Sequence, residues 1–218
     1  MSNSVRPYEM KDMLRVPLVT TLETSAGTLF LRNGCTPDLV EHLKADPGLK
    51  AFTRRAERKY ELLMMLAQRS DSNLTLAYTP GGEIVGEVAL APADSWWQGL
   101  GQINEIAVQV SSRWRRLGIA SNLLALALEQ DYVEDWIIIA LGFSWHWDLE
   151  GLGLTSYRYR QLIGRLFAHF GFAEYLTSEP DIREDAANVF LARIGRKVKP
   201  DTMDSFFSRL LSTEIPLR

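Results

Sequence analysis

The chain has a single cysteine, Cys35, among its 218 residues. An internal disulfide is therefore excluded, and a reducing, cytoplasmic setting is expected. The three histidines, His42, His146 and His169, show no metal-ligand spacing, and the lone cysteine adds none. The sequence also lacks the Gly-x-Ser-x-Gly elbow of serine hydrolases. We therefore expect neither a metal cofactor nor a serine nucleophile.

The chain also lacks a large net charge and a long apolar run. The net charge is −3, from 27 acidic and 24 basic residues, whereas a general nucleic-acid binder needs a basic excess to release phosphate counterions. The longest apolar run, Trp136–Trp145, is interrupted by glycine and serine and is shorter than the ~20 residues of a membrane span. Residues 1–7 lack the apolar core of a signal peptide. We expect no nucleic-acid and no membrane partner.

What the sequence does contain is enough apolar material for a core, since 46% of its residues are hydrophobic. Alternating runs around glycine turns predict two hairpins, and helical spacing with capping signals predicts several helices. The expected strands are 19–23, 28–32, 74–78, 84–90, 102–110, 136–145, 172–177 and 189–194. The expected helices are 36–43, 49–68 (with its charges on the exposed side), 118–129, 159–170 and 203–211. This mixture predicts an α+β fold on one mixed sheet.

The most informative stretch runs from Gln102 to Glu129. Ile106, Val108 and Val110 alternate, which predicts a strand on which these three residues share one face. After a short turn, apolar residues recur at helical spacing. They are Ile119, Leu123, Leu126 and Ala127. The stretch therefore predicts a strand, a tight basic turn and a helix, which together form one parallel crossover.

The turn in this stretch has the composition of an anion site. Small residues at Gly118 and Ala120 let the backbone approach a ligand, and a helix that begins there directs free N–H groups and its positive dipole end at an anion. Neither a Walker A loop nor a Gly-x-Gly-x-x-Gly fingerprint is present. An ordinary strand-to-helix turn with a solvated basic patch is the alternative. The predicted pyrophosphate site comprises Arg115, Arg116, Leu117, Gly118, Ile119, Ala120 and Ser121.

The order Arg-x-x-Gly-x-Ala after an apolar strand resembles motif A of the GNAT superfamily of N-acetyltransferases, whose turn wraps the pyrophosphate of acetyl-coenzyme A. The resemblance implies a largely antiparallel mixed sheet flanked by helices on both faces. A second element, Leu166–Phe172, resembles the place where a GNAT helix ends at Gly-Phe. In that superfamily an aromatic residue four positions before the glycine is often the tyrosine that protonates the departing thiolate. Here it is Phe167, which has no proton to give.

A closer resemblance covers the second half of the chain, from about Gln102, and links it to the acetoin-utilisation acetyltransferases of the AcuA family. It implies a single GNAT domain over 1–218, with an N-terminal extension at 1–16 and a family-specific C-terminal strand and helix in 178–218. It also implies acetyl transfer to a lysine of acetyl-coenzyme A synthetase, which inactivates that enzyme. The strings that carry it are Trp145-His146-Trp147-Asp148-Leu149, Tyr159-Arg160, Glu179-Pro180-Asp181-Ile182, Ala187-Asn188 and Ala192-Arg193-Ile194-Gly195.

Transfer to a lysine requires a base, because the amine has an unperturbed pKa of ~10.4. Glu105 is the candidate, since it is a charge on a strand expected to be covered on both faces. A strand-end position, or pairing with an arginine, is its alternative explanation, and Asn104 would take the position if the register slips by one. The backbone N–H of Val110 is the candidate oxyanion donor, and backbone groups of Val108 and Val110 are expected to align the pantetheine arm.

Three further residues are candidate substrate contacts: His146, Asp148 and Tyr159. His146 and Asp148 could orient a base or contact the acceptor, and Tyr159 could replace Phe167 as a proton donor, but a structural position in the core is the favoured explanation for His146 and Tyr159. Arg158, Arg160 and Arg165 could reach coenzyme phosphates or simply be solvated. Two other functions stay open. One is acetylation of a small-molecule amine, and the other is a regulatory module that binds acetyl-coenzyme A or the synthetase with little turnover.

Overall fold

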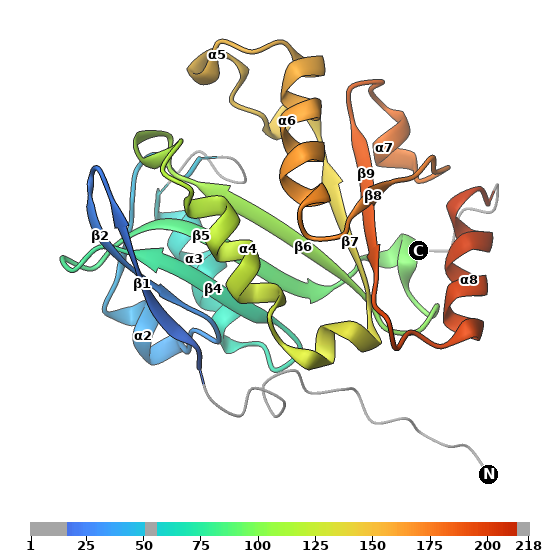
Figure 1. Cartoon of the computed structure of the whole chain (residues 1–218), viewed down its shortest axis with the longest axis horizontal. Coiled ribbons are helices and arrows are strands. Elements are labelled where there is room, and N and C mark those ends of the chain that lie inside the picture. Colours follow the sequence, from blue (N-terminus) through green and yellow to red (C-terminus); the bar gives the residue numbers. More distant parts are fainter. Residues whose placement is uncertain (1–16, 51–55, 213–218) are drawn as a thin grey trace.

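The computed structural model of the chain describes residues 17–50 and 56–212 (Figure 1). The extension expected at 1–16 and residues 51–55 of the helix expected over 49–68 lie outside this range. Within it, the strands form one nine-stranded sheet in the order β1-β2-β4-β5-β6-β7-β9-β8, with β3 paired to β5. The strands are β1 (Val19–Thr24), β2 (Gly27–Arg32), β3 (Lys44–Ala45), β4 (Asn73–Tyr78), β5 (Glu83–Pro92), β6 (Ile103–Val110), β7 (Ile137–Gly142), β8 (Ala173–Glu174) and β9 (Val189–Ile194).

Most strand pairs are antiparallel, and the parallel pairs are β3–β5 and β6–β7. The second of these closes the predicted crossover, because α4 connects the end of β6 to the start of β7. The helices are α2 (Pro37–Glu41), α3 (Ala56–Gln68), α4 (Ile119–Leu128), α5 (Leu149–Leu152), α6 (Ser156–Ala168), α7 (Pro180–Arg183) and α8 (Pro200–Leu210). Short 3-10 turns are η1 (Ser95–Trp97), η2 (Ser112–Trp114), η3 (Asp131–Asp135) and η4 (Ser144–His146).

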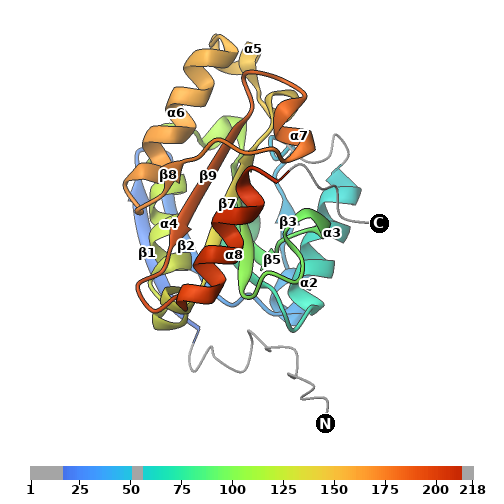
Figure 2. The same ribbon diagram turned by 90° about the vertical axis from the view of Figure 1, so that its right-hand side faces the viewer.

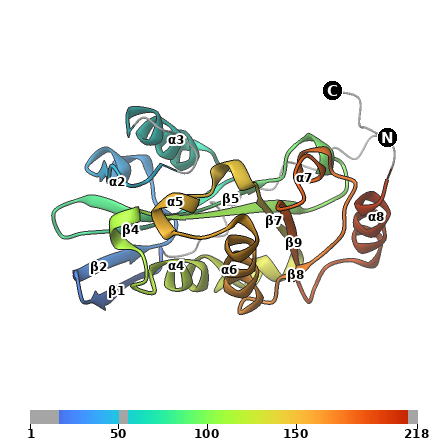
Figure 3. The same ribbon diagram turned by 90° about the horizontal axis from the view of Figure 1, so that it is seen from above.

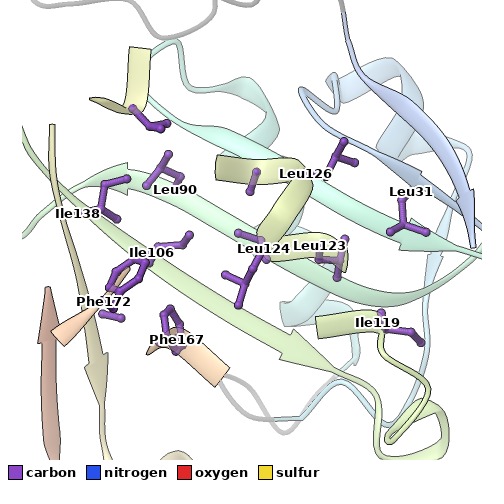
Figure 4. Close-up of a cluster of buried hydrophobic side chains, with 14 of the residues drawn as sticks. Leu31, Leu90, Ile106, Ile119, Leu123, Leu124, Leu126, Ile138, Phe167 and Phe172 are labelled. Atoms are coloured by element: carbon purple, nitrogen blue, oxygen red, sulfur yellow. The ribbon is translucent and has the colours of Figure 1, made fainter. Parts of the chain in front are cut away.

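Helices cover both faces of the sheet, as the α+β expectation required (Figure 3). We call the face beneath α4 and α6 the α4 face, and the face beneath α2, α3, α7 and α8 the α3 face. Figure 2 shows α8 packed against β7 and β9 at one end of the sheet. The apolar stripe predicted from the sequence does lie in the core, because Ile119, Leu123 and Leu126 are buried with Ile106 on the α4 face (Figure 4).

The predicted hairpins, the strand of β6 and the helix of α4 are confirmed, but several boundaries differ, and α6 and α8 each begin three residues before the expected start. Leu49 and Lys50 are not helical. The N–H of Leu49 donates to the carbonyl of Asp46 at 3.0 Å, so the chain makes a turn here. The strand expected to reach Trp145 ends at Gly142, where the chain enters η4. The strand expected over 172–177 shortens to Ala173–Glu174 at the sheet edge.

Lys59 departs from the expected charged, exposed side of α3. It is fully buried, and its ammonium donates to Glu87 on β5 and to Gln109 Oε1 on β6, the latter at 2.8 Å. A buried charge is tolerated when it is paired and hydrogen-bonded. Helical spacing alone could not show this, because the partners come from strands 28 and 50 residues further along. The pair holds α3 against the two central strands.

Candidate active site

The parallel strands β6 and β7 pair over three rungs only, from Ile103 opposite Ile137 to Glu105 opposite Ile139. Beyond Glu105, β6 continues to pair with β5, and β7 beyond Ile139 pairs with β9. The two strands therefore separate toward their C-terminal ends, as Figure 1 shows. We call the space between these facing edges the wedge. Its apex is at Glu105, and its open end is at the turn before α4.

The backbone of β6 presents free hydrogen-bonding groups to the wedge. Successive residues of a strand direct their N–H and C=O groups to opposite neighbours. Ser111 donates its N–H to a β5 carbonyl at 2.8 Å, whereas the carbonyl of Gln102 accepts from Ile137 of β7 at 3.1 Å. Even-numbered residues therefore face β7, and the N–H and C=O groups of Val108 and Val110 point into the wedge. These are the two residues whose backbone the sequence analysis selected.

The turn at the open end of the wedge directs N–H groups outward. Arg116 and Gly118 both have left-handed backbone conformations, with φ of 62° and 75°. Gly118 is the N-cap of α4, and no side chain caps the helix. The first intrahelical bond runs from the N–H of Asn122 to the carbonyl of Gly118 at 3.1 Å. The N–H groups of Ile119, Ala120 and Ser121 therefore have no partner within the helix, which is the arrangement that binds phosphate at helix N-termini.

This turn is fixed to the body of the protein through Asp46. Its carboxylate accepts from Ser111 Oγ at 2.7 Å and from the guanidinium of Arg113, which also bonds Glu83 at 3.1 Å. Burial alone would raise the pKa of Asp46, but hydrogen bonds from Ser111, Arg113 and the Gly48 N–H lower it overall. Arg113 is thus paired with Asp46 and Glu83, although its side chain is 59% exposed, and Arg116 is a further exposed basic side chain of the turn.

Arg115 is tied to the segment that follows β7. Its guanidinium lies 2.7 Å from Asp148 Oδ2, and the other oxygen of Asp148 accepts the N–H of Gly151 at 3.0 Å to cap α5. The hydrogen bond from Arg115 lowers the pKa of Asp148. Beside this pair, the rings of Trp147 and Tyr159 stack with centroids 5.0 Å apart. Asp148 and Tyr159 therefore connect α5 and α6 to the turn before α4.

Glu105 lies at the apex of the wedge on the α3 face, opposite the fully buried Ile139. It is the third residue of β6 and so does not lie at a strand end, and within residues 17–50 and 56–212 no arginine forms an ion pair with it. Burial, and then the charges of Asp94 and Glu179, raise the pKa of Glu105 to about 7. A carboxylate with this pKa can accept a proton near neutral pH. Asn104 points to the opposite face, because strand side chains alternate.

Glu179 is the functional candidate that sequence reasoning missed. It is 3% exposed, and its Oε2 accepts the N–H of Ile182 at 2.8 Å at the start of α7. Burial is the largest cause that raises its pKa to about 7, and Asp181 and Asp94 add to it. From the sequence, Glu179 contributed only as part of the Glu179-Pro180-Asp181-Ile182 string of the family resemblance. Its proximity to Glu105 comes from the position of α7 on the α3 face, which no local pattern encodes.

His146 lies on the rim of the wedge rather than at its apex. It is half-buried beside Phe143 and Trp145, with ring centroids 5.9 Å from each, and burial lowers its pKa. The Trp-His-Trp-Asp string is thus divided between two directions, because Trp147 and Asp148 contact Tyr159 and Arg115.

Comparison with known proteins shows one relationship over most of the chain. A crystal structure of an acetoin utilization protein from Exiguobacterium sibiricum is 30% identical, covers 90% of this chain and 94% of its own, and superposes with a TM-score of 0.85. The chain belongs to the AcuA family of acetoin utilization proteins. The acetoin utilization protein AcuA of Bacillus subtilis is 26% identical over 190 residues, which span 85% of this chain and 90% of the relative. No family model matches the sequence.

The AcuA family chain has the GNAT acetyltransferase fold. The GNAT domain of S. lividans PAT superposes on 80% of this chain and 95% of its own with a TM-score of 0.53, at 16% identity. The resemblance to the AcuA family and the α+β fold class inferred from the sequence are therefore confirmed.

In this family member, Phe167 belongs to the core. It is 4% exposed and meets Phe172 edge-on, with centroids 5.0 Å apart (Figure 4). Of the helix arginines, Arg160 is occupied, because it donates to the carbonyls of Ala186 and Asn188 at 2.7 Å and pairs with Glu174. Arg158 and Arg165 are exposed. Arg160 therefore braces α6 against the turn before β9 and is not free for a phosphate.

Residues 17–50 and 56–212 contain no group of three or more His, Cys, Asp or Glu side chains placed to hold a metal ion. In the same ranges, every helix is too short or too polar to cross a membrane. A cavity of about 830 Å³ lies along α6, but its lining includes no residue of β6 or of the turn before α4.

Proposed function

We propose that the chain transfers the acetyl group of acetyl-coenzyme A to a lysine of acetyl-coenzyme A synthetase, and that this occurs in the cytoplasm. The observation that carries the proposal is the wedge, which leads from a carboxylate of raised pKa at its apex to uncapped helix N–H groups at its open end. The family resemblance supports the choice of acceptor. The buried, unpaired Cys35 fits a reducing compartment.

In this proposal the turn before α4 holds the donor's pyrophosphate. The N–H groups from Leu117 to Ser121 and the guanidinium of Arg116 supply hydrogen bonds and positive charge, while Arg115 contributes from its pair with Asp148. The pantetheine arm then runs along the wedge and bonds the free backbone groups of Val108 and Val110 in the manner of a strand. The thioester lies toward Glu105.

At the apex, Glu105 takes a proton from the acceptor ammonium, directly or through one water, and the freed amine attacks the thioester carbon. The rise of ~3.3 Å per strand residue places the N–H of Val110 roughly 15 Å along β6 from Glu105, and that of Val108 roughly 9 Å. The base and the thioester carbonyl must both lie next to the acceptor nitrogen. We therefore assign the oxyanion donor to the backbone N–H of Val108, which is the nearer one, and the backbone of Val110 to the pantetheine arm.

The departing group does not need a dedicated acid in this scheme. A thiol has an unperturbed pKa of ~8.5, far below that of an amine, so the tetrahedral intermediate expels the thiolate, which takes up the second proton that the attacking nitrogen loses. Phe167 is a core residue, and Tyr159 stacks on Trp147, with a hydroxyl whose pKa is raised by burial. Neither residue is assigned to the proton transfer.

The test is incubation of the chain with labelled acetyl-coenzyme A and purified acetyl-coenzyme A synthetase. We expect label on a synthetase lysine. Label on small amines alone would favour the small-molecule alternative, and a stable unlabelled complex would favour the regulatory module. The carboxyl group at the apex favours the enzyme, because a module that only binds has no use for a half-buried group whose pKa is raised to about 7.

The pH dependence of the transfer step follows from the raised pKa of Glu105. Its proton is bound below about 7, so turnover of the ternary complex should fall as pH decreases through that value. Replacing the charge in Glu179→Gln should move this midpoint to lower pH, because one negative neighbour is lost, while Asp94 and burial remain. The profile is measured from kcat at saturating substrates, with the exposed Glu129→Gln as the control. An unmoved midpoint in Glu179→Gln would show that the two carboxyl groups do not interact.

A further inference from the structure

The chain after β7 exposes an aromatic surface at the rim of the wedge. Phe143 and Trp145 stack with ring centroids 4.7 Å apart and planes at 9°, and His146 meets both rings edge-on. The Trp145 side chain remains 52% exposed although it is the largest apolar group in the segment. We call Phe143, Trp145 and His146 the platform. An exposed aromatic pair is a common feature of surfaces that bind a partner.

The platform is bound to α7 as one unit. The N–H of Ser144 donates to Asn188 Oδ1 at 2.7 Å, and its hydroxyl donates to Asp185. The amide of Asn188 in turn donates to the carbonyl of Asp181 at 2.9 Å. Ser144 is therefore joined directly to Asp185, and through the buried Asn188 to Asp181 at the other end of the α7 segment. Their relative positions are fixed before any partner arrives.

The α7 segment gives the platform a negative border. From Glu179 to Asp185 there are four acidic residues and one arginine, and the acids at 181, 184 and 185 are exposed. The buried acid, Glu179, lies close enough to Glu105 to affect its pKa. Negative charge thus extends from the rim beside the aromatic rings to the apex of the wedge.

We propose that the platform and the acidic α7 segment form the docking surface for a basic polypeptide segment that carries the acceptor lysine. This inference rests on the proposed function and specifies the kind of acceptor. A cationic side chain gains from the face of an indole ring and from neighbouring carboxylates together. Such a surface selects for positive charge next to the modified lysine.

The distance along β7 separates this surface from the reacting amine. Phe143 follows Ile139, the partner of Glu105, by four residues, which is about 13 Å of strand. That is more than one lysine side chain can span, so the platform contacts residues beside the acceptor lysine and not the lysine itself. A small amine would reach Glu105 without touching the platform. The arrangement therefore favours a polypeptide.

The direct test compares Trp145→Ala with Tyr157→Ala. Tyr157 is also an exposed aromatic residue, at 67%, but lies on α6 outside the platform. With acetyl-coenzyme A synthetase as acceptor, Trp145→Ala should lower kcat/KM at least tenfold through KM, and Tyr157→Ala should not change it. Affinity for acetyl-coenzyme A, measured by calorimetry, should be the same in both variants and the parent chain.

A charge reversal tests the acidic border separately. Glu184→Lys should raise KM for the synthetase several-fold, and the effect should shrink at high salt, because exposed charges are screened. Glu129→Lys makes the same change at an exposed position after α4 and should have no effect. Both variants replace exposed side chains, so both should fold.

The outcomes separate this inference from the proposed function, because binding of the synthetase is also measured directly by calorimetry. If the synthetase is acetylated with equal kcat/KM by Trp145→Ala and Tyr157→Ala, the proposed docking surface is wrong and the proposed reaction stands. If Trp145→Ala weakens binding of the synthetase but no acetyl transfer occurs, the proposed reaction is wrong and the docking surface stands. Acetylation of small amines with no binding of the synthetase would overturn both.

Discussion

Glu105→Gln should lower acetyl transfer to lysine by about two or more orders of magnitude, and affinity for acetyl-coenzyme A should remain nearly unchanged. The substitution keeps the size of the side chain at the apex but removes its ability to take a proton. Binding is retained because the proposed coenzyme contacts, from Leu117 to Ser121 and along the wedge, do not involve this carboxylate. Transfer is measured as single-turnover rate, and affinity by calorimetry.

In the same variant the transfer rate should no longer fall as the pH decreases through about 7, because the carboxyl group assigned to that fall is gone. It should also be at least as stable as the parent at pH 8. A carboxyl whose folded pKa is raised favours folding while protonated, and that contribution disappears as pH rises through about 7. Glutamine carries no such charge to bury. A single-turnover rate equal to that of the parent would remove Glu105 from the mechanism.

Gly118→Glu should abolish binding of acetyl-coenzyme A, with a loss of at least about a hundredfold in Kd. The residue is the N-cap of α4, and a Cβ there would meet only the Asn122 amide, at 3.5 Å. The new side chain would therefore extend into the open space before the helix. Its carboxylate would satisfy the free N–H groups itself and repel the pyrophosphate. Calorimetry with acetyl-coenzyme A measures the loss.

Gly99→Glu is the matched control, because Gly99 has nearly the same left-handed backbone, with φ of 77° against 75°, and nothing within 4 Å of an added Cβ. Each substitution carries a similar backbone cost, roughly 1–2 kcal/mol, so the two should lose similar stability in urea unfolding. The control should still bind the coenzyme. Normal affinity in Gly118→Glu would show that the pyrophosphate does not lie at this helix.

The strand, turn and helix from Gln102 to Glu129 could be predicted because each depends on neighbours in the sequence. Alternation places Ile106, Val108 and Val110 on one face, and helical spacing places Leu123 and the residues after it against the same core. The direction in which Val108 and Val110 present their backbone groups follows from the same alternation. The candidate pyrophosphate turn was visible in the sequence for this reason.

Contacts between distant segments could not be predicted in this way. The effect of Glu179 on Glu105 spans 74 residues of sequence and depends on α7 crossing the α3 face. The pairing of Arg115 with Asp148, and the burial of Lys59, likewise join residues from separate elements. Periodicity assigns such charges to solvent, because it contains no information about which element will cover them.

The sequence by itself thus determined the longer strands of the sheet, the order of the central crossover and the residues that begin α4, since these follow from local geometry and apolar spacing. The tertiary structure alone decided where β6 and β7 separate, which charges are buried and which side chains form the rim. Separation of two strands depends on what packs on each, and the pKa of a carboxyl depends on every charge and apolar group around it. Both are properties of the assembled chain.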